Sequence, residues 1–264
     1  MIFAHIKART LGGEPLLADR DVAEGFWVSL RRTWPEALSA CVMPTHAHLA
    51  VAVPHLVHAR RKTGRLLSGT ARRLGRRRLW FPADVTRVAD TRHLARLVRY
   101  HHLNPCADHL VSEPREWAWS THRGLLGAEV DPWVEPLRLA AALGWSAQGF
   151  VERFNAYTVS DPDRGGDPTL PVPVPPSEVP SHPLELIARA AQHSGRWLRP
   201  RDQRRMAVLL ARRQGHRQAR PIAAAFGLGE STVRRLWLPR RGDDDLVRPA
   251  AVCLGDERLL RFTG

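Results

Sequence analysis

Two short stretches of this sequence carry side chains that could together break a phosphodiester bond. The first is His46-Ala47-His48. On a β-strand, side chains two residues apart project from the same face, and two imidazoles placed in this way can share a divalent metal ion. Because the chain contains 13 histidines, the spacing of this pair alone does not distinguish a metal site from chance.

The second stretch supplies a nucleophile. Tyr100 and Asn104 are one turn apart on a helix, so they share a face, and the asparagine oxygen could be a third metal ligand. A free phenol attacks poorly, because its deprotonation at pH 7.5 costs about 3.4 kcal/mol. A metal ion that polarises the scissile phosphate makes the attack feasible. Tyr157 is the other tyrosine of the chain.

These residues lie in three blocks that resemble a known family. Residues 42–49 (VMPTHAHL) resemble its signature VMPNHVHLL, residues 99–111 (RYHHLNPCADHLV) resemble RYIHLNPVRAGLV, and residues 116–123 (EWAWSTHR) resemble DWPWSSYR. In this order the blocks are typical of the REP-associated tyrosine transposases, a branch of the single-tyrosine HUH endonucleases. The resemblance covers roughly residues 1–127. The chain departs from the pattern at Ala47, at Cys106-Ala107 and at His109, where the family has glycine.

The resemblance implies a fold and an activity. The fold would be a ferredoxin-like antiparallel sheet with helices, and a Mg²⁺ or Mn²⁺ ion would sit on His46, His48 and Asn104. Tyr100 would attack single-stranded hairpin DNA, giving a 5′-phosphotyrosyl link and a free 3′-OH, so that the protein would be a transposase. The alternative is a catalytically inactive, domesticated DNA-binding protein or transcription regulator that keeps this fold.

Residues 56–78 contain nine arginines or lysines and no acid. Such a charge density favours a polyanionic partner, although a solvated helix face is the simpler alternative. The candidate DNA contacts here are Arg60, Arg61, Lys62, Arg72, Arg73, Arg76 and Arg77.

A second DNA-binding element is predicted at residues 219–238. A helix-turn-helix needs a small residue inside its first helix and a glycine at the turn, and Ala223 and Gly227 meet these needs. Glu230 or Ser231 would cap the second helix. Residues 200–238 resemble the DNA-binding domain of the replication initiator DnaA, and an ordinary helical hairpin is the alternative. The candidate contacts are Arg217, Arg220, Ser231, Thr232, Arg234 and Arg235.

The composition of the whole chain also supports DNA as the partner. The net charge is +14 and the pI about 11.3, and basic proteins of this kind bind nucleic acid. Residues 158–183 hold eight prolines, which predicts an extended linker. We therefore expect an HUH domain at 1–157, this linker, and a helical DNA-binding domain at 184–264.

The elements needed to position the site can be read from periodicity. We expect strands at 3–10, 37–43 and 46–53 and helices at 20–32, 56–78 and 91–103, which predicts an α+β sandwich. Beyond the linker we expect helices at 183–192, 201–213, 221–226 and 230–238. Of His101 and His102, one is expected to pack and one to be exposed, and the core is expected to include Trp117, Trp119, Trp133 and Trp145.

The remaining features concern location and assembly. The three cysteines lie far apart, without a Cys-x-x-Cys pair, which favours a reducing compartment. No apolar run is long enough for a membrane span. We expect a cytoplasmic, nucleoid-associated monomer or homodimer.

Overall fold

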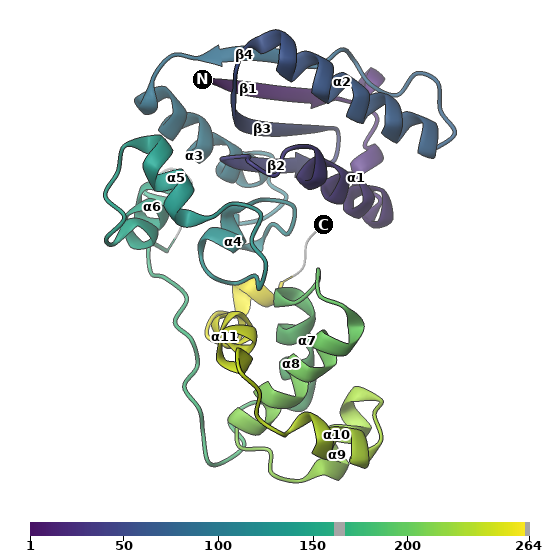
Figure 1. Cartoon of the computed structure of the whole chain (residues 1–264), viewed down its shortest axis with the longest axis vertical. Coiled ribbons are helices and arrows are strands. Elements are labelled where there is room, and N and C mark those ends of the chain that lie inside the picture. The colour runs from purple at the N-terminus through teal and green to yellow at the C-terminus, as the bar shows by residue number, and fades with distance from the viewer. Residues whose placement is uncertain (161–166, 262–264) are drawn as a thin grey trace. The chain divides into compact units, whose positions relative to one another are not determined.

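The computed structural model describes residues 1–160 and 167–261, so residues 161–166 of the expected linker lie outside the described part. Contacts divide the chain into two units (Figure 1). Among the described residues, the first unit holds 1–125, 133–160 and 167–169, and the second holds 126–132 and 170–261. Among the described residues, no helix combines the length and the apolarity that crossing a membrane would require.

The first unit is a mixed α/β fold built on an antiparallel sheet. Within the described residues the sheet has four strands in the order β2-β3-β1-β4. Its helices and strands are β1 (Ile2–Arg9), α1 (Arg20–Thr33), β2 (Ser39–Met43), β3 (His46–Val53), α2 (Leu56–Arg73), β4 (Asp84–Val88), α3 (Thr91–Ala107), α4 (His122–Leu125), α5 (Pro136–Leu143) and α6 (Phe150–Val159). The expected α+β class with an antiparallel sheet is confirmed.

Strand β4 was not expected from the sequence. It pairs antiparallel with β1 at the edge of the sheet, and of its five residues only Val85 and Val88 are buried. Two apolar positions three apart do not give the strict alternation by which a strand is recognised in a sequence. Tertiary pairing with β1 therefore determines the structure of this segment.

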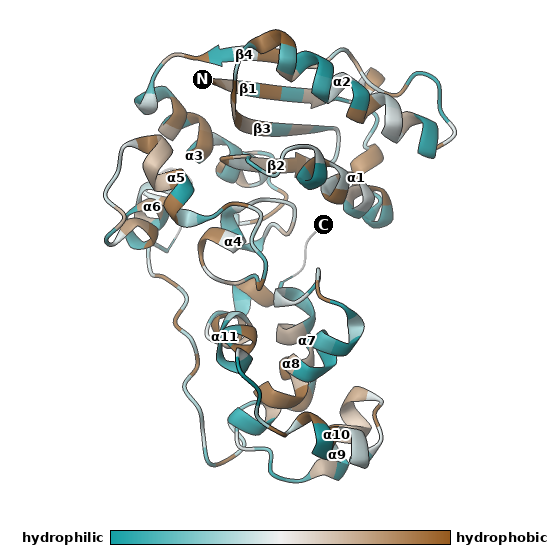
Figure 2. Cartoon of the chain, viewed as in Figure 1, coloured by the Kyte–Doolittle hydropathy of each residue, from teal (hydrophilic) through white to brown (hydrophobic). Residues whose placement is uncertain are grey.

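The two faces of the sheet differ because side chains alternate along each strand. Ala4, Ile6 and Ala8 of β1 are buried on one face, together with Leu49 and Val51 of β3. Helix α2 contacts β1, β3 and β4 and packs beside α1, so this pair of helices covers the apolar face. In Figure 2, hydrophilic and hydrophobic residues alternate along α2, as expected for a helix with one buried side.

The other face of the sheet is covered in part by α3. Ala50 of β3 and Val88 of β4 lie on this face and belong to one core cluster with Leu94 and Val98 of α3. The same cluster includes buried residues of α5 and α6. Helix α3 contacts β2 and β3, so it lies over one half of the face.

Helix α2 is shorter than the periodicity predicted. It ends at Arg73, and Gly75 follows with φ of 66°, in the left-handed region that glycine adopts without strain. The amide of Arg76 then donates to the carbonyl of Ala71, which closes the helix end. Arg76 and Arg77 therefore belong to a loop and not to a helix.

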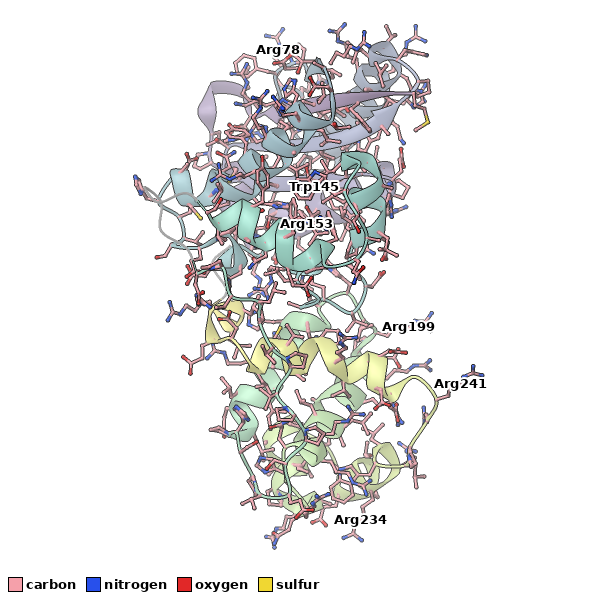
Figure 3. All side chains as sticks on the ribbon, turned by 90° about the vertical axis from the view of Figure 1, so that its left-hand side faces the viewer. Arg78, Trp145, Arg153, Arg199, Arg234 and Arg241 are labelled. Atoms are coloured by element: carbon pink, nitrogen blue, oxygen red, sulfur yellow. The ribbon has the colours of Figure 1, made fainter. Side chains whose placement is uncertain are left out.

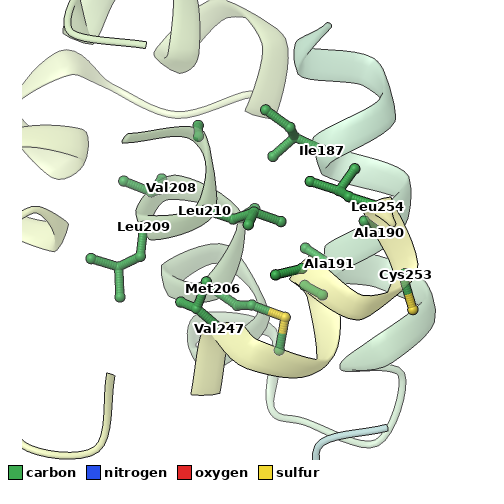
Figure 4. Packing of buried hydrophobic residues seen from close by; sticks show 14 of the residues in the cluster. Ile187, Ala190, Ala191, Met206, Val208, Leu209, Leu210, Val247, Cys253 and Leu254 are labelled. Atoms are coloured by element: carbon green, nitrogen blue, oxygen red, sulfur yellow. The ribbon is translucent and has the colours of Figure 1, made fainter. Parts of the chain in front are cut away.

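The second unit is helical. Its elements are α7 (Leu184–Ser194), α8 (Pro200–Arg213), α9 (Ala219–Phe226), α10 (Glu230–Leu236) and α11 (Asp243–Leu254). Helices α7, α8 and α11 contact one another and enclose a core that includes Ile187, Met206, Val208, Leu210 and Val247 (Figure 4). Helix α11 was not expected. Its three aspartates suit the first turn of a helix, but it contains Pro249, which is rare inside helices.

Two segments outside the expected helical domain also pack in this unit. The amide of Val130 donates to the carbonyl of Ser194 at 3.0 Å, and Glu129 pairs with Arg196 at 2.8 Å. The proline-rich stretch is held as well, because the amide of Val174 donates to the carbonyl of Ala251. Residues 170–183 are thus extended, as expected, but are bound along the helical unit by backbone hydrogen bonds.

Candidate active site

The His46 and His48 side chains project from β3 on the face that α3 partly covers. They follow the Pro44-Thr45 turn, and their register places them opposite Arg9 and Lys7 of β1. His46 is half-buried, whereas His48 is 1% exposed. The intervening Ala47 points to the apolar face and is fully buried.

Helix α3 brings Tyr100 and Asn104 to the same place. The Tyr100 ring lies edge-on to the His48 ring, with centroids 5.3 Å apart. The Asn104 amide Nδ2 is 3.3 Å from His46 Nε2. Tyr100 is 44% exposed although the neighbouring His48 and His101 are buried, so its phenol is accessible to solvent. All four residues predicted from the sequence therefore lie together.

Two further histidines join this group. His5 Nε2 is 2.9 Å from His48 Nδ1, and the His101 ring stacks on His48 with centroids 5.2 Å apart. His5, His48 and His101 each offer a ring nitrogen within 4.8 Å of the others, so this triad could hold a metal ion. His5 was missed because only the β1–β3 register, over 40 residues apart in sequence, brings it here.

His101 and His102 are both fully buried, so the expectation that one would be exposed was wrong. His101 Nδ1 is 2.7 Å from Ser39 Oγ, and His102 Nε2 is 3.1 Å from Thr121 Oγ1. These hydroxyls satisfy one nitrogen of each ring, which allows burial. The expected burial of Trp117, Trp119 and Trp133 is confirmed, and Trp145 packs partly buried against the α3 cluster.

Burial keeps the histidines of the site neutral. Desolvation lowers the pKa of His46 to about 4 and that of His5 to about 4. For His48, burial and the neighbouring His46 and His5 lower the pKa to about 2. A neutral imidazole has a free nitrogen lone pair, which is the form that binds a metal.

The Tyr100 phenol remains protonated at neutral pH. Burial is the main cause that raises its pKa, and the carboxylate of Asp108 adds to the shift. Asp108 lies one turn beyond Asn104, where it caps α3. Any attack by Tyr100 therefore requires that its proton leave as the new bond forms.

The donor atoms fit a metal ion. His46 Nδ1 is 2.9 Å from Thr45 Oγ1, and His48 Nδ1 faces His5, so both rings are oriented through Nδ1. His48 Nε2 is buried without a hydrogen-bond partner, a state that costs about 1–3 kcal/mol unless another group satisfies it. A ring oriented through one nitrogen, with the other free, is typical of a metal ligand. His48 has this arrangement, whereas His46 Nε2 faces the Asn104 amide nitrogen at 3.3 Å.

The basic residues of α2 lie elsewhere. Helix α2 packs on the apolar side of the sheet, opposite His46, His48 and Tyr100. Several cations of α2 and of the loop that follows it have partners within the protein: Arg60 donates to the carbonyl of Val85, Lys62 pairs with Glu36 at 3.1 Å, and Arg76 pairs with Glu14. Arg61, Arg72, Arg73 and Arg77 are exposed, and Figure 3 shows the neighbouring Arg78 at the outer surface.

A shallow pocket of about 510 Å³ lies between α1 and α2. Arg65, Arg72 and Arg73 line it together with Ser29 and Thr70. Its walls are on the layer opposite the tyrosine, so it is separate from the histidine site.

The helical unit places the other candidate contacts on α9, on α10 and before α9. Ile222, Ala223 and Val233 are buried between these helices and the core, and Gly227 makes the turn with φ of 63°. The N-cap of α10 is Gly229, without a side-chain cap, so neither Glu230 nor Ser231 caps it as expected. Arg217, Arg220, Ser231, Arg234 and Arg235 are exposed and Thr232 is half-buried; Figure 3 shows Arg234 at the surface.

Comparison with known proteins gives one loose structural likeness. No protein-family model matches the chain, and no curated protein sequence matches it. A solved structure of a REP-associated tyrosine transposase bound to a REP hairpin is similar over 46% of this chain and 76% of that chain, at 16% identity and a TM-score of 0.39. A likeness of this size describes neither the site nor the substrate of this chain.

Proposed function

We propose that this protein is a metal-dependent single-stranded DNA endonuclease and strand transferase that uses Tyr100 as its nucleophile, as in the REP-associated tyrosine transposases. The observation that carries the proposal is the position of Tyr100. Its exposed phenol ring stands 5.3 Å from His48, and Asn104, one turn away, reaches His46. Tyrosine, paired histidines and asparagine on one polar patch support phosphodiester chemistry better than they support a structural role.

His46, His48 and Asn104 would hold a Mg²⁺ or Mn²⁺ ion, which would polarise the scissile phosphate when bound. These three donors are preferred to the His5–His48–His101 triad because a DNA phosphate must reach the site from solvent. His46 is half-exposed, whereas His101 is fully buried. His5 would instead orient His48 by its hydrogen bond to Nδ1.

Tyr100 would attack phosphorus through its phenol oxygen. The new bond joins Tyr100 Oη to the 5′-phosphate, the bond from phosphorus to the 3′ oxygen breaks, and that oxygen leaves as a free 3′-OH after taking up a proton. Because the phosphotyrosyl bond resembles the bond that was broken, the reverse attack by a 3′-OH would rejoin strands. The reaction needs no outside energy source, since one phosphodiester replaces another.

The helical unit would add duplex recognition. A helix in the position of α10 reaches a major groove with its exposed face, where Arg234, Arg235, Ser231 and Thr232 are available. Arg217 and Arg220 precede or begin α9 and would contact phosphates. The exposed arginines Arg61, Arg72, Arg73 and Arg77 of the first unit would give weaker, sequence-independent attraction, to which Arg60, Lys62 and Arg76 contribute less because they have protein partners.

A covalent-adduct assay tests the function. The protein is incubated with Mn²⁺ and labelled hairpin oligonucleotides from the repeats flanking its gene, and a denaturing gel shows any protein that carries DNA. We expect a shifted band that disappears in Tyr100→Phe and persists in Tyr157→Phe, the matched control because Tyr157 is the other tyrosine of the chain. Tight hairpin binding without an adduct in any divalent metal would instead identify a DNA-binding protein on this fold.

A further inference from the structure

A second surface adjoins the tyrosine on the half of the polar face that α3 leaves uncovered. The register places His5, Lys7 and Arg9 of β1 on the same face as His46 and His48. Lys7 is half-exposed and Arg9 is exposed. They are about 7 Å apart along the strand, as for any residues two apart. This row of two cations begins next to the histidine site, because Lys7 lies opposite His48.

The charges of this row are not balanced by ion pairs in the part of the chain that the structure describes. Within the described residues, neither Lys7 nor Arg9 has a carboxylate ion-pair partner. Asp84 of β4 is opposite Lys7 in the register, and it is the one acid on the described strands of this face. The charge of Lys7 acts on the histidine site, since it lowers the pKa of His46 and of His48. Exposed positive charge of this kind attracts phosphates.

An aromatic ring completes the surface at the far end of the row. Phe81 is 42% exposed, and the Arg9 guanidinium lies 5.8 Å from its ring centroid. The backbone that carries Phe81 is fixed, because its amide donates to the carbonyl of Arg9 at 3.0 Å. The preceding Trp80 pairs with Thr10 and stacks on Phe26 at 5.0 Å. The ring is thus presented to solvent on a rigid support.

We propose that Lys7, Arg9 and Phe81, here called the β1 strip, bind the unpaired strand beside the phosphate that Tyr100 attacks. Lys7 and Arg9 contact successive phosphates, and one base stacks on Phe81. Rows of cations with an aromatic platform are the usual means of binding single strands without reading their sequence. The ligand is single-stranded because a paired base has its faces covered by its neighbours. The inference rests on the proposed function for the position of the scissile phosphate.

The test measures binding separately from cleavage. Fluorescence anisotropy follows a labelled 12-nucleotide oligo-dT and a matched duplex, with the full chain carrying Tyr100→Phe, in EDTA. We expect Phe81→Ala to weaken single-strand binding by roughly 5- to 150-fold, the range for loss of one base stack, and Phe81→Trp to retain it. Lys7→Gln and Arg9→Gln should each lower the salt-dependence slope by about 0.7. Duplex binding should change less than twofold.

Arg87 provides a matched control. It is an exposed arginine on the same sheet, but its register opposite Ala4 places it on the other face. Arg87→Gln should leave single-strand affinity within twofold of the parent. If Arg87→Gln weakens binding as much as Arg9→Gln, or if Phe81→Ala has no effect, the β1 strip is not the binding surface.

A parallel adduct assay with Tyr100 restored separates this inference from the proposed function. If an adduct forms but the strip variants bind single strands as well as the parent, the β1 strip is not the binding surface and the proposed nuclease activity stands. If single-strand binding depends on the β1 strip but no adduct forms, the strip is the binding surface and the proposed nuclease activity is wrong.

Discussion

The two faces of the sheet are built from the same strands but differ in polarity and in how completely helices cover them. On one face Ile6, Leu49 and Val51 are fully buried under α1 and α2. On the other face His5 and His48, their immediate neighbours in sequence, form a polar group that α3 covers only in part. The difference shows that a period of two lets one strand supply stability and chemistry at once, without either set of side chains intruding on the other.

The polar face lowers the stability of the fold. His48 is buried with one nitrogen unpartnered, and such a group costs about 1–3 kcal/mol. Buried polar groups left unsatisfied are expected at functional sites, where the ligand satisfies them. The comparison therefore predicts that substitutions on the polar face mainly change activity, whereas substitutions on the apolar face mainly change stability.

The largest expected effect is on activity. His48→Ala removes a ring that we propose holds the metal ion, and loss of metal stabilisation of the transition state is worth several kcal/mol. The rate of adduct formation should fall by about 1,000-fold or more, while the urea midpoint stays near that of the parent. Single-turnover kinetics in Mn²⁺ measure the rate. An unchanged rate of adduct formation in this variant would contradict the proposed role of His48 as a metal ligand.

The next effect is on stability alone. Leu49→Ala, one residue along the same strand, should lower the free energy of unfolding by about 2–5 kcal/mol, since Leu49 is fully buried and its removal leaves a cavity. Urea unfolding measures the change. At a temperature where the variant remains folded, adduct formation should keep at least half of its rate. A selective loss of rate would show that the faces are not independent.

The polar face should also make stability depend on pH. Burial lowers the folded pKa of His5 and His46 on this face to about 4, and that of His102, on α3, to about 3. These values lie below the unfolded value near 6.5. Between these values the unfolded chain binds more protons, so the metal-free protein should be most stable above pH 6.5 and lose stability as the pH falls toward 4. Urea unfolding in EDTA at pH 7.5, 6 and 5 tests this. A flat profile would mean that the histidines are charged or exposed.

The smallest effect is expected at the end of the helix that covers the polar face. His109 follows α3 with φ of 56°, a left-handed conformation that costs a non-glycine residue about 1–2 kcal/mol. His109→Gly should therefore raise the free energy of unfolding, by about 1 kcal/mol after the flexibility of glycine in the unfolded chain is counted. His109→Ala is the control and should not stabilise. Equal stability of all three would show that the strain is absent in solution.

The sequence predicted the local parts of the site better than the parts that depend on pairing. Tyr100 and Asn104 share a helix face, and His46 and His48 share a strand face, because both spacings are fixed by local geometry. That the two faces meet was predicted by the family resemblance, and the geometry agrees, although the roles of these residues stay predictions. His5 and the β1 strip depend on the β1–β3 register, which no local pattern reveals.

The domain boundaries were obscured for a similar reason. Residues 126–132 were expected within the domain at 1–157, yet Glu129 and Val130 bind α7 and the residues that follow it. The proline-rich stretch has no periodicity, so its backbone hydrogen bonds could not be foreseen: Ser177 donates to Arg213 of α8, and Val174 donates to Ala251 of α11. Extended segments bound through their backbones leave little trace in side-chain patterns.

The most direct test of the central claim is to find the covalent bond itself. Wild-type protein is incubated with Mn²⁺ and a hairpin substrate, digested with nuclease and trypsin, and analysed by mass spectrometry for a peptide that carries a nucleotide. The account predicts a 5′-linked nucleotide on the peptide containing Tyr100, absent when Mn²⁺ is replaced by EDTA. A nucleotide on Tyr157 or on another residue, or cleaved DNA with no protein-linked nucleotide, would contradict it.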